Sequence, residues 1–215
     1  MLAAPASAAP VLAPLNRCYI AAAPEPTQRE RVRVSATGFT PLATVDIYVD
    51  DVFQDETQAF YDGSIDGAAL APYSDEPQRP FTVRLTERDA PINTAAQASL
   101  VTRLAVEQVP SRAGTRRRVR FRGRGFTSLD TVYAHYVFAG KSRRTVRIGH
   151  AHGPCGTFSK RRRQFPFKRR PRAGSWTIWF DQERTYNPNA SPRVSLEVTV
   201  KKRARIKGRR RARHR

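Results

Sequence analysis

One stretch of this sequence occurs twice, and this internal repeat constrains the fold more than any other feature. The first copy reads RVRVSATGFTPLATV over residues 31–45, and the second reads RVRFRGRGFTSLDTV over residues 118–132. The spacing is 87 residues throughout, since 119 minus 32 and 132 minus 45 give the same value. A chain of 215 residues with such a repeat is expected to contain two similar units of about 85 residues each.

Both copies alternate in the way a half-buried β-strand does. In the first copy Val32, Val34 and Ala36 share one side, while arginine and hydroxyl side chains occupy the other. A Gly-Phe pair then predicts a turn, after which the alternation resumes. No segment is convincingly helical, which indicates an all-β class. We expect strands near 31–37, 44–50, 81–87 and 98–106, and Asp-Gly turns at 62–63 and 66–67.

The later parts of the two copies also match. Residues 79–85 parallel residues 174–180 at a spacing of 95, which exceeds the first spacing by eight. The second copy therefore carries an insertion, which we expect within 149–172, where Gly, Pro and basic residues cluster. Each copy is expected to close with a strand, at 100–106 in the first and 194–200 in the second.

The repeat predicts two β-sandwich domains in tandem. Their junction is expected at 109–114, where Pro110 and Gly114 interrupt the alternation. The predicted parts are an Ala/Pro-rich leader (1–23), an acidic sandwich (24–109), a basic sandwich (115–200) and a disordered basic tail (201–215).

The Gly-Phe-Thr-Pro-x-x-x-Val-x-Ile pattern that begins at Gly38 resembles the opening strands of bacterial immunoglobulin-like modules in exported, cell-envelope proteins. The resemblance covers both repeats and implies two tandem immunoglobulin-like β-sandwich domains. It implies no particular activity, because it depends on strand and turn chemistry that many proteins share. The Cys-Trp-Cys framework of antibody domains is absent from the sequence.

The N-terminus and the two cysteines bear on localisation. Residues 6–8, Ala-Ser-Ala, have the small-residue form of a signal-peptidase site, so the leader is expected to be the end of an export signal that starts upstream of Met1. An Ala/Pro leader without function is the alternative. Cys18 and Cys155 would form one disulfide in an exported protein, and two unrelated free thiols otherwise. No apolar run reaches the roughly 18 residues that span a bilayer.

No catalytic or metal-binding signature stands above background. His150, His152 and Cys155 lie close in sequence, but structural zinc takes four ligands and a Gly-Pro loop explains the same residues. The acidic residues between 50 and 66 depart from the spaced Asp-x-Asp-x-Asp-Gly pattern of a calcium loop. No Gly-x-Ser-x-Gly elbow or phosphate-binding glycine loop is present. We therefore expect no enzyme, no cofactor and no metal. Trp176 shares its side of the strand with Ile178 and Phe180 and is expected in the core. Trp179, on the polar side, is either an interdomain or loop contact or a ligand platform.

Charge is divided unevenly along the chain. Residues 1–110 contain 8 Lys/Arg and 14 Asp/Glu, a net charge of −6, whereas residues 111–215 contain 31 and 4, a net charge of +27. These values add to the formal net charge of +21. Such asymmetry indicates an anionic partner for the second half, attraction between the halves, or both. The alternative is composition, because a GC-rich genome could produce the excess of arginine without selection for binding.

Alternate arginines suggest where an anion would bind. On an extended strand, the arginines at 116, 118, 120, 122 and 124 would lie on one face about 7 Å apart. A basic loop is expected over 161–170, beside Phe165 and Phe167, followed by the basic tail. The predicted polyanion-binding residues are Arg116, Arg118, Arg120, Arg122, Arg124, Arg161, Arg162, Arg163, Lys168, Arg169 and Arg170.

Three classes of function fit these features. The first is a non-enzymatic, exported or cell-envelope protein whose second domain contacts anionic wall polymers, lipid headgroups or another protein. The second is an intracellular nucleic-acid-binding protein without sequence specificity, since no recognised reading motif is visible. An enzyme is the third. A basic and apolar signal encoded upstream of Met1 would separate the first class from the second.

Overall fold

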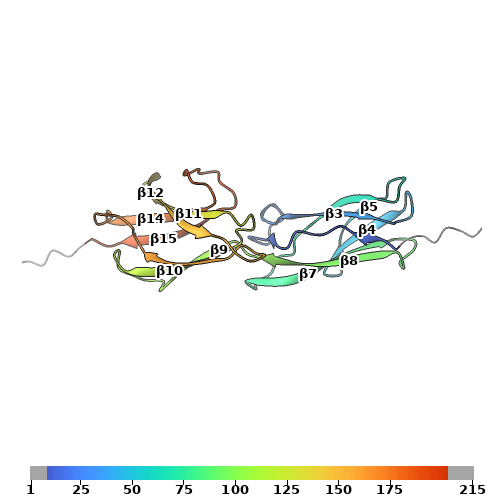
Figure 1. Cartoon of the computed structure of the whole chain (residues 1–215), viewed down its shortest axis with the longest axis horizontal. Coiled ribbons are helices and arrows are strands. Elements are labelled where there is room, and N and C mark those ends of the chain that lie inside the picture. The colour runs from blue at the N-terminus through green and yellow to red at the C-terminus, as the bar shows by residue number, and fades with distance from the viewer. Residues whose placement is uncertain (1–8, 203–215) are drawn as a thin grey trace, which may run out of the picture.

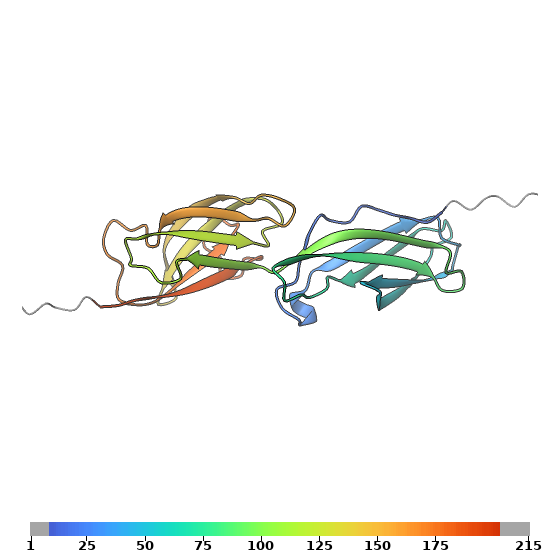
Figure 2. The ribbon, with the colours of Figure 1, turned by 90° about the horizontal axis from the view of Figure 1, so that it is seen from below.

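The computed structural model describes residues 9–202 and shows an all-β, sandwich-like fold built from several sheets. Within these residues the one helical element is the 3-10 turn η1 (Pro26–Gln28). None of the described helices is long and apolar enough to cross a membrane. The strands fall into two sets, which lie end to end along the long axis (Figures 1 and 2).

The first set packs a three-stranded sheet against a five-stranded sheet. The strand orders are β1-β3-β6 and β2-β8-β7-β4-β5. All pairs are antiparallel except β2 with β8. The strands are β1 (Val11–Leu12), β2 (Tyr19–Ile20), β3 (Arg31–Thr37), β4 (Thr44–Val49), β5 (Val52–Gln58), β6 (Ile65–Leu70), β7 (Gln78–Glu87) and β8 (Thr94–Thr102).

The second set has the same arrangement with one strand fewer. Its sheets have the orders β13-β10-β9 and β12-β11-β14-β15, and all of their pairs are antiparallel. The strands are β9 (Ala105–Val109), β10 (Arg118–Arg124), β11 (Thr131–Phe138), β12 (Lys141–His150), β13 (Phe158–Arg163), β14 (Gly174–Asp181) and β15 (Val194–Val200).

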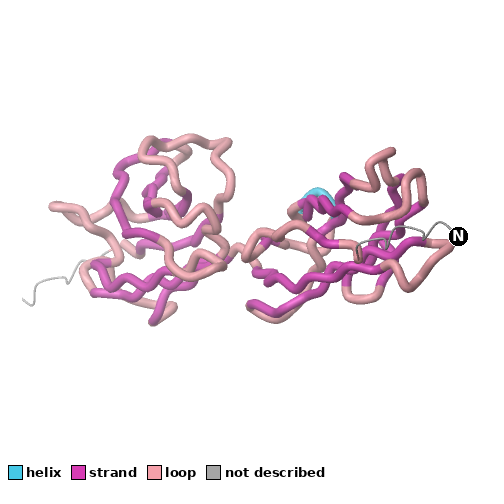
Figure 3. The backbone as a smooth tube through the Cα atoms, turned by 45° about the vertical axis from the view of Figure 1, so that its right-hand side comes forward, coloured by secondary structure: helices cyan, strands magenta, loops and turns pink. Residues whose placement is uncertain are grey.

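The repeat in the sequence is a repeat of strands and core positions. Strands β3 and β10 start 87 residues apart, as do β4 and β11. In both β3 and β10, exposed arginines or hydroxyl residues alternate with buried residues, which are Val32, Val34 and Ala36 in β3 and Val119, Phe121 and Gly123 in β10. Each half has its own hydrophobic core, around Val34 and Ile47 in the first and around Phe121 and Ile178 in the second. The tube in Figure 3 follows these two separate groups of strands.

The Gly-Phe corner follows the expected chemistry in both copies. Gly38 and Gly125 have φ angles of +90° and +89°, which glycine adopts without a steric penalty. The following Phe39 and Phe126 are buried in the two cores. At Gly125 a Cβ atom would also lie 2.8 Å from the Cα atom of Leu104, so both the backbone angle and the packing favour glycine.

Part of the predicted leader, 1–23, belongs to the folded first half. Residues 1–8, with the signal-peptidase motif, lie outside the described residues, but β1 and β2 lie within the first half. Leu12, Tyr19 and Ala21 are buried in its core. The sequence did not reveal this because strands of two residues are too short to show alternation.

The junction between the halves also differs from the prediction. The expected strand at 98–106 is two strands, because the chain leaves β8 after Thr102 and enters β9 at Ala105. Strand β9 pairs with β10, and Val106 packs in the second core. The crossing is therefore at residues 103–104 rather than 109–114. Residues 101–106 contain neither Gly nor Pro, so no break is visible in the sequence there.

Two predicted loops contain strands. The basic segment expected as a loop over 161–170 begins as β13, which pairs with β10 along its whole length. The Asp-Gly turn expected at 66–67 lies inside β6, where a Cβ on Gly67 would come within 2.8 Å of the Ile47 Cδ1 atom. That glycine thus permits close packing rather than a turn. Of the eight inserted residues, six precede β13, because β6 and β13 start at 65 and 158, a spacing of 93.

Candidate polyanion-binding surface

Strand β10 presents three arginines on one face of the three-stranded sheet. Arg118, Arg120 and Arg122 are exposed, whereas the intervening Val119, Phe121 and Gly123 are buried. This separation arises because successive side chains of a strand point to opposite faces. The arginine side chains therefore leave the sheet on its outer face, about 7 Å apart along the strand.

Strand β13 places further arginines beside them. In the antiparallel register Arg118 is opposite Arg163 and Arg120 is opposite Arg161. Directly opposite residues share a face and have Cβ atoms about 4.5–5.5 Å apart. Arg161 and Arg163 are exposed. We call this surface the arginine face; its residues are Arg118, Arg120, Arg122, Arg161 and Arg163.

The arginine face is poorly neutralised by the protein itself. On the other side of β10, Glu107 of β9 is opposite Arg122, and their side chains approach to 3.5 Å. Among the described residues, no carboxylate forms an ion pair with the other four arginines. Like charges directly opposite each other destabilise a sheet, so the two arginine pairs favour an external anion between them.

Three other arginines that were predicted to bind polyanions, Arg116, Arg162 and Arg124, lie outside the arginine face. Arg116 lies in the turn before β10 rather than on the strand. Arg162 points toward the other side of β13, opposite Val119, and is half-buried. Arg124, at the end of β10, lines a groove of about 720 Å³ together with His150, His152 and Lys160. The five-arginine strand of the sequence prediction is thus replaced by a two-strand surface.

Lys168, Arg169 and Arg170, which were also predicted to bind polyanions, lie apart from the arginine face. They lie in the loop after β13 and line a hollow of about 280 Å³ with Phe138, Phe167 and Trp176. The Arg170 guanidinium donates a hydrogen bond of 3.2 Å to the carbonyl of Lys201. Lys201 and Lys202 are exposed, and the predicted tail beyond them lies outside the described residues.

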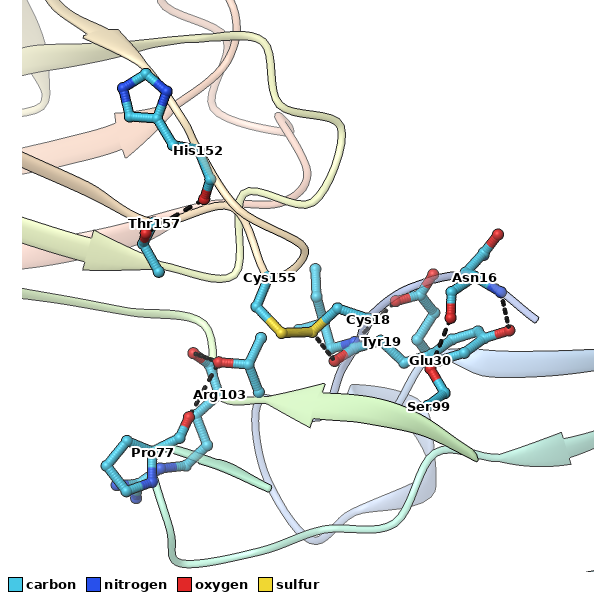
Figure 4. The surroundings of a disulfide bond; sticks show 12 residues. Asn16, Cys18, Tyr19, Glu30, Pro77, Ser99, Arg103, His152, Cys155 and Thr157 are labelled. Atoms are coloured by element: carbon cyan, nitrogen blue, oxygen red, sulfur yellow. Dashed lines mark hydrogen bonds between the residues drawn. A yellow bond between two sulfur atoms is a disulfide. The ribbon is translucent and has the colours of Figure 1, made fainter. Parts of the chain in front are cut away.

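A disulfide joins the two halves of the chain. Cys18 and Cys155 are bonded and buried, with Cα atoms 5.1 Å apart and a sequence separation of 137 (Figure 4). The segment around Cys18 is tied to the first half, where the Ser99 hydroxyl donates to the carbonyl of Asn16 over 2.6 Å. The Cys155 carbonyl accepts from the N–H of Gly125 over 2.9 Å. The disulfide is thus a second covalent connection between the halves.

The histidines near Cys155 do not form a metal site with it, because its sulfur is in the disulfide. Within residues 9–202 no group of three or more His, Cys, Asp and Glu side chains is arranged to hold a metal ion. Of the acidic residues between 50 and 66, Asp50, Asp51 and Glu56 are instead paired with arginines. Asp50 contacts Arg79 over 2.7 Å, and Arg88 bridges Asp46 and Glu56.

A buried histidine and aspartate form a site that the sequence analysis missed. His135 is fully buried, and its Nε2 atom lies 2.9 Å from Asp181 Oδ1 and 3.1 Å from the carbonyl of Glu183. Since both partners are acceptors, Nε2 carries a hydrogen and donates it. His135 Nδ1 lies 2.9 Å from the Thr145 hydroxyl, so this histidine connects three neighbouring strands.

Trp179, the alternative ligand platform, is covered by the protein itself. The guanidinium of Arg193 lies 3.9 Å from the centre of its ring and 4.8 Å from that of Tyr186. Arg193 Nε is also 3.9 Å from Asp181 Oδ2. The loop contact is therefore the arrangement found, and Trp176 is buried as expected. Positions 135 and 181 each adjoin an apolar run in the sequence, which was the available signal for the buried pair.

Comparisons with known proteins identify no family. No protein-family model and no curated protein matches the chain. Among solved structures, red sea bream transglutaminase is similar at 12% identity, with 80% of this chain and 29% of the transglutaminase chain covered and a TM-score of 0.28. The chain therefore spans less than a third of that protein, and a similarity of this level carries no argument about function.

Proposed function

We propose that this chain is a non-enzymatic, exported or cell-envelope protein that binds anionic polymers or surfaces through its basic second half. The observation that carries the proposal is the arginine face. In each of two cross-strand pairs, one arginine lies directly opposite another, and none of the four has a carboxylate partner among the described residues. An anionic polymer would remove this repulsion and gain a charge-assisted hydrogen bond from each guanidinium group.

Tandem immunoglobulin-like domains are part of the same proposal. In the second half, counted from β9, the first, second and fifth strands share one sheet, and the third, sixth and seventh share the other. Immunoglobulin sandwiches divide their strands in the same way. The first half repeats this order through β1, β3, β4, β5, β6, β7 and β8.

The disulfide favours export over the alternative of an intracellular nucleic-acid-binding protein. Disulfides persist in oxidising compartments and are rare in the cytosol. Acid quenching of intact cells, followed by alkylation of the denatured, unreduced protein, would test this point, because denaturation exposes the two buried cysteines. We expect Cys18 and Cys155 to resist alkylation, whereas two alkylated cysteines would support the intracellular alternative.

The absence of catalysis is also a proposal, supported by the burial of the His135–Asp181 pair. A histidine that is fully enclosed and held by three partners cannot reach a substrate.

A salt titration of the full chain tests the binding proposal. Affinity for duplex DNA and for a poly(glycerol phosphate) should fall steeply with salt for both polymers, because each contacted charge releases condensed counterions. The two affinities at one salt concentration should differ only modestly, since guanidinium groups on a flat sheet read charge and not sequence. Salt-independent affinity, or strong preference for one DNA sequence, would contradict the proposal.

A further inference from the structure

Two equivalent strands form open edges in the two halves. Strand β5 pairs with β4 alone, and β12 pairs with β11 alone, among the strands that the structure describes. Each therefore has one side whose backbone N–H and C=O groups face no other strand. They contain seven and ten residues, so both are long enough to accept another strand.

These two edges carry opposite charges. Strand β5 contains Asp55 and Glu56 and no basic residue, and its preceding turn adds Asp50 and Asp51. Three of these carboxylates pair with arginines of their own half, but no ion pair is formed by Asp55 within residues 9–202. Strand β12 contains no acidic residue. Its cations, none of which pairs with a carboxylate in the described part of the chain, are Lys141, Arg143, Arg144 and Arg147.

One antiparallel register matches the charges on both faces at once. If Asp55 of one chain is opposite Arg144 of another, then Glu56 is opposite Arg143, since both pairs of numbers add to 199. The sides also agree. Asp55 is the register partner of buried Ile47 within its own sheet, and Arg144 is the partner of buried Tyr136. Both side chains therefore leave on the core side. Each strand has a β-bulge beside these residues, where the register shifts between Ile47 and Tyr48 and between Tyr136 and Val137, so the match of faces applies to these two pairs and not to the full length of the strands.

We propose that this chain associates with a second copy of itself, with β5 of one chain added in antiparallel orientation to β12 of the other. Pairing of two β5 edges would oppose carboxylates, and pairing of two β12 edges would oppose guanidinium groups. Both like pairings are disfavoured, whereas the mixed pairing is favoured. Each chain offers both edges, so the assembly is a dimer when one pair of chains satisfies both and a longer chain when it does not.

The proposed edge is separate from the arginine face. Strand β12 lies in the four-stranded sheet, and the arginines of the binding proposal lie on the three-stranded sheet. Variants can therefore change one surface at a time.

Sedimentation velocity of the nuclease-treated full chain, over a range of concentrations at low and high salt, tests the proposal. We expect concentration-dependent association at low salt that weakens at high salt. The variants D55R/E56R and R143E/R144E should each raise the dissociation constant about tenfold or more. In each variant, two cross-strand pairs of opposite charge become pairs of like charge. An equimolar mixture of the two variants should associate again, since each supplies the edge that the other lacks.

Matched controls separate edge pairing from net charge and from polyanion binding. D75R/E76R changes the charge as much as D55R/E56R does, on exposed residues outside the sheets. R118E/R120E, on the arginine face, changes the net charge as much as R143E/R144E does. Both controls should associate like the unmodified chain. A wild-type chain that stays monomeric at low salt, or controls that dissociate as much as the edge variants, would overturn the proposal.

Cross-linking tests the register directly. In the proposed pairing, residues 55 and 144 of two chains have Cβ atoms about 4.5–5.5 Å apart, which is close to the range that a disulfide spans. A mixture of the single variants D55C and R144C should give a disulfide-linked pair under mild oxidation. A mixture of D75C and R144C should not, and equal cross-linking in both mixtures would contradict the register.

Discussion

Replacing two arginines of the arginine face should reduce the salt dependence of polyanion binding by a calculable amount. Four of its five arginines have no carboxylate partner in the described structure, so they are available to phosphates. Each phosphate contact on duplex DNA contributes about −0.9 to the slope of log affinity against log salt. The four together should contribute about −3.6, and the variant R118Q/R120Q should remove about half of this, a change of about 1.8.

The change in slope translates into a measurable difference in affinity. Between 50 and 200 mM salt, a slope change of about 1.8 corresponds to a factor of about 12. The variant should therefore lose about 12-fold less affinity over this range than the unmodified chain. Fluorescence anisotropy with a labelled duplex, repeated at several salt concentrations, measures both slopes in the full chain.

The first half supplies a matched control for this measurement. Arg31 and Arg33 occupy the positions on β3 that Arg118 and Arg120 occupy on β10, but their partners on β6 are Leu70 and Ala68. The variant R31Q/R33Q removes the same charge from an equivalent strand that lacks opposite arginines. An equal loss of slope in both variants would refute the arginine face and leave net charge as the cause.

Three further predictions concern stability, and urea denaturation checks each of them. R161Q should stabilise the protein by about 0.2–1 kcal/mol at low salt, because it removes one opposed arginine pair, and the gain should vanish at high salt; destabilisation at low salt would contradict this. C18S/C155S should lower the free energy of unfolding by about 2–5 kcal/mol, and two reactive thiols in the denatured, unreduced protein would show that the disulfide is absent. D181A should cost about 3–5 kcal/mol because it leaves His135 without its buried partner, whereas D130A at an exposed position should change stability by less than about 0.5 kcal/mol.

The long strands could be predicted because their alternation is local. The expected strands at 31–37 and 44–50 correspond to β3 and β4, and the Gly-Phe corners have the positive φ angles that glycine permits. Side-chain parity, which follows from the pleat of a strand, also placed Trp176 in the core. Where a segment was too short or too polar to alternate, as in β1, β2 and β13, the sequence predicted a leader or a loop instead.

The arginine face shows the limit of the sequence most clearly. Alternate arginines on one strand were visible from residue spacing, but their pairing with Arg161 and Arg163 depends on a register 41 to 45 residues away in sequence. A strand's register is set by the core it covers and by the turns that join it, which no single segment encodes. The same holds for the His135–Asp181 pair, whose members lie on neighbouring strands and meet only when β11 pairs with β14.

The sequence by itself determined the repeat, the all-β class, the alternation of the long strands and the division of charge between the halves. These properties follow from residue order and composition, because backbone geometry and side-chain parity act over a few neighbouring residues. Only the tertiary structure decided where the chain crosses between the halves, whether the two cysteines come within bonding distance and which arginines face one another. Those outcomes depend on contacts between segments far apart in sequence, and these form because the inner faces of the two sheets in each half bury their apolar side chains in one shared core.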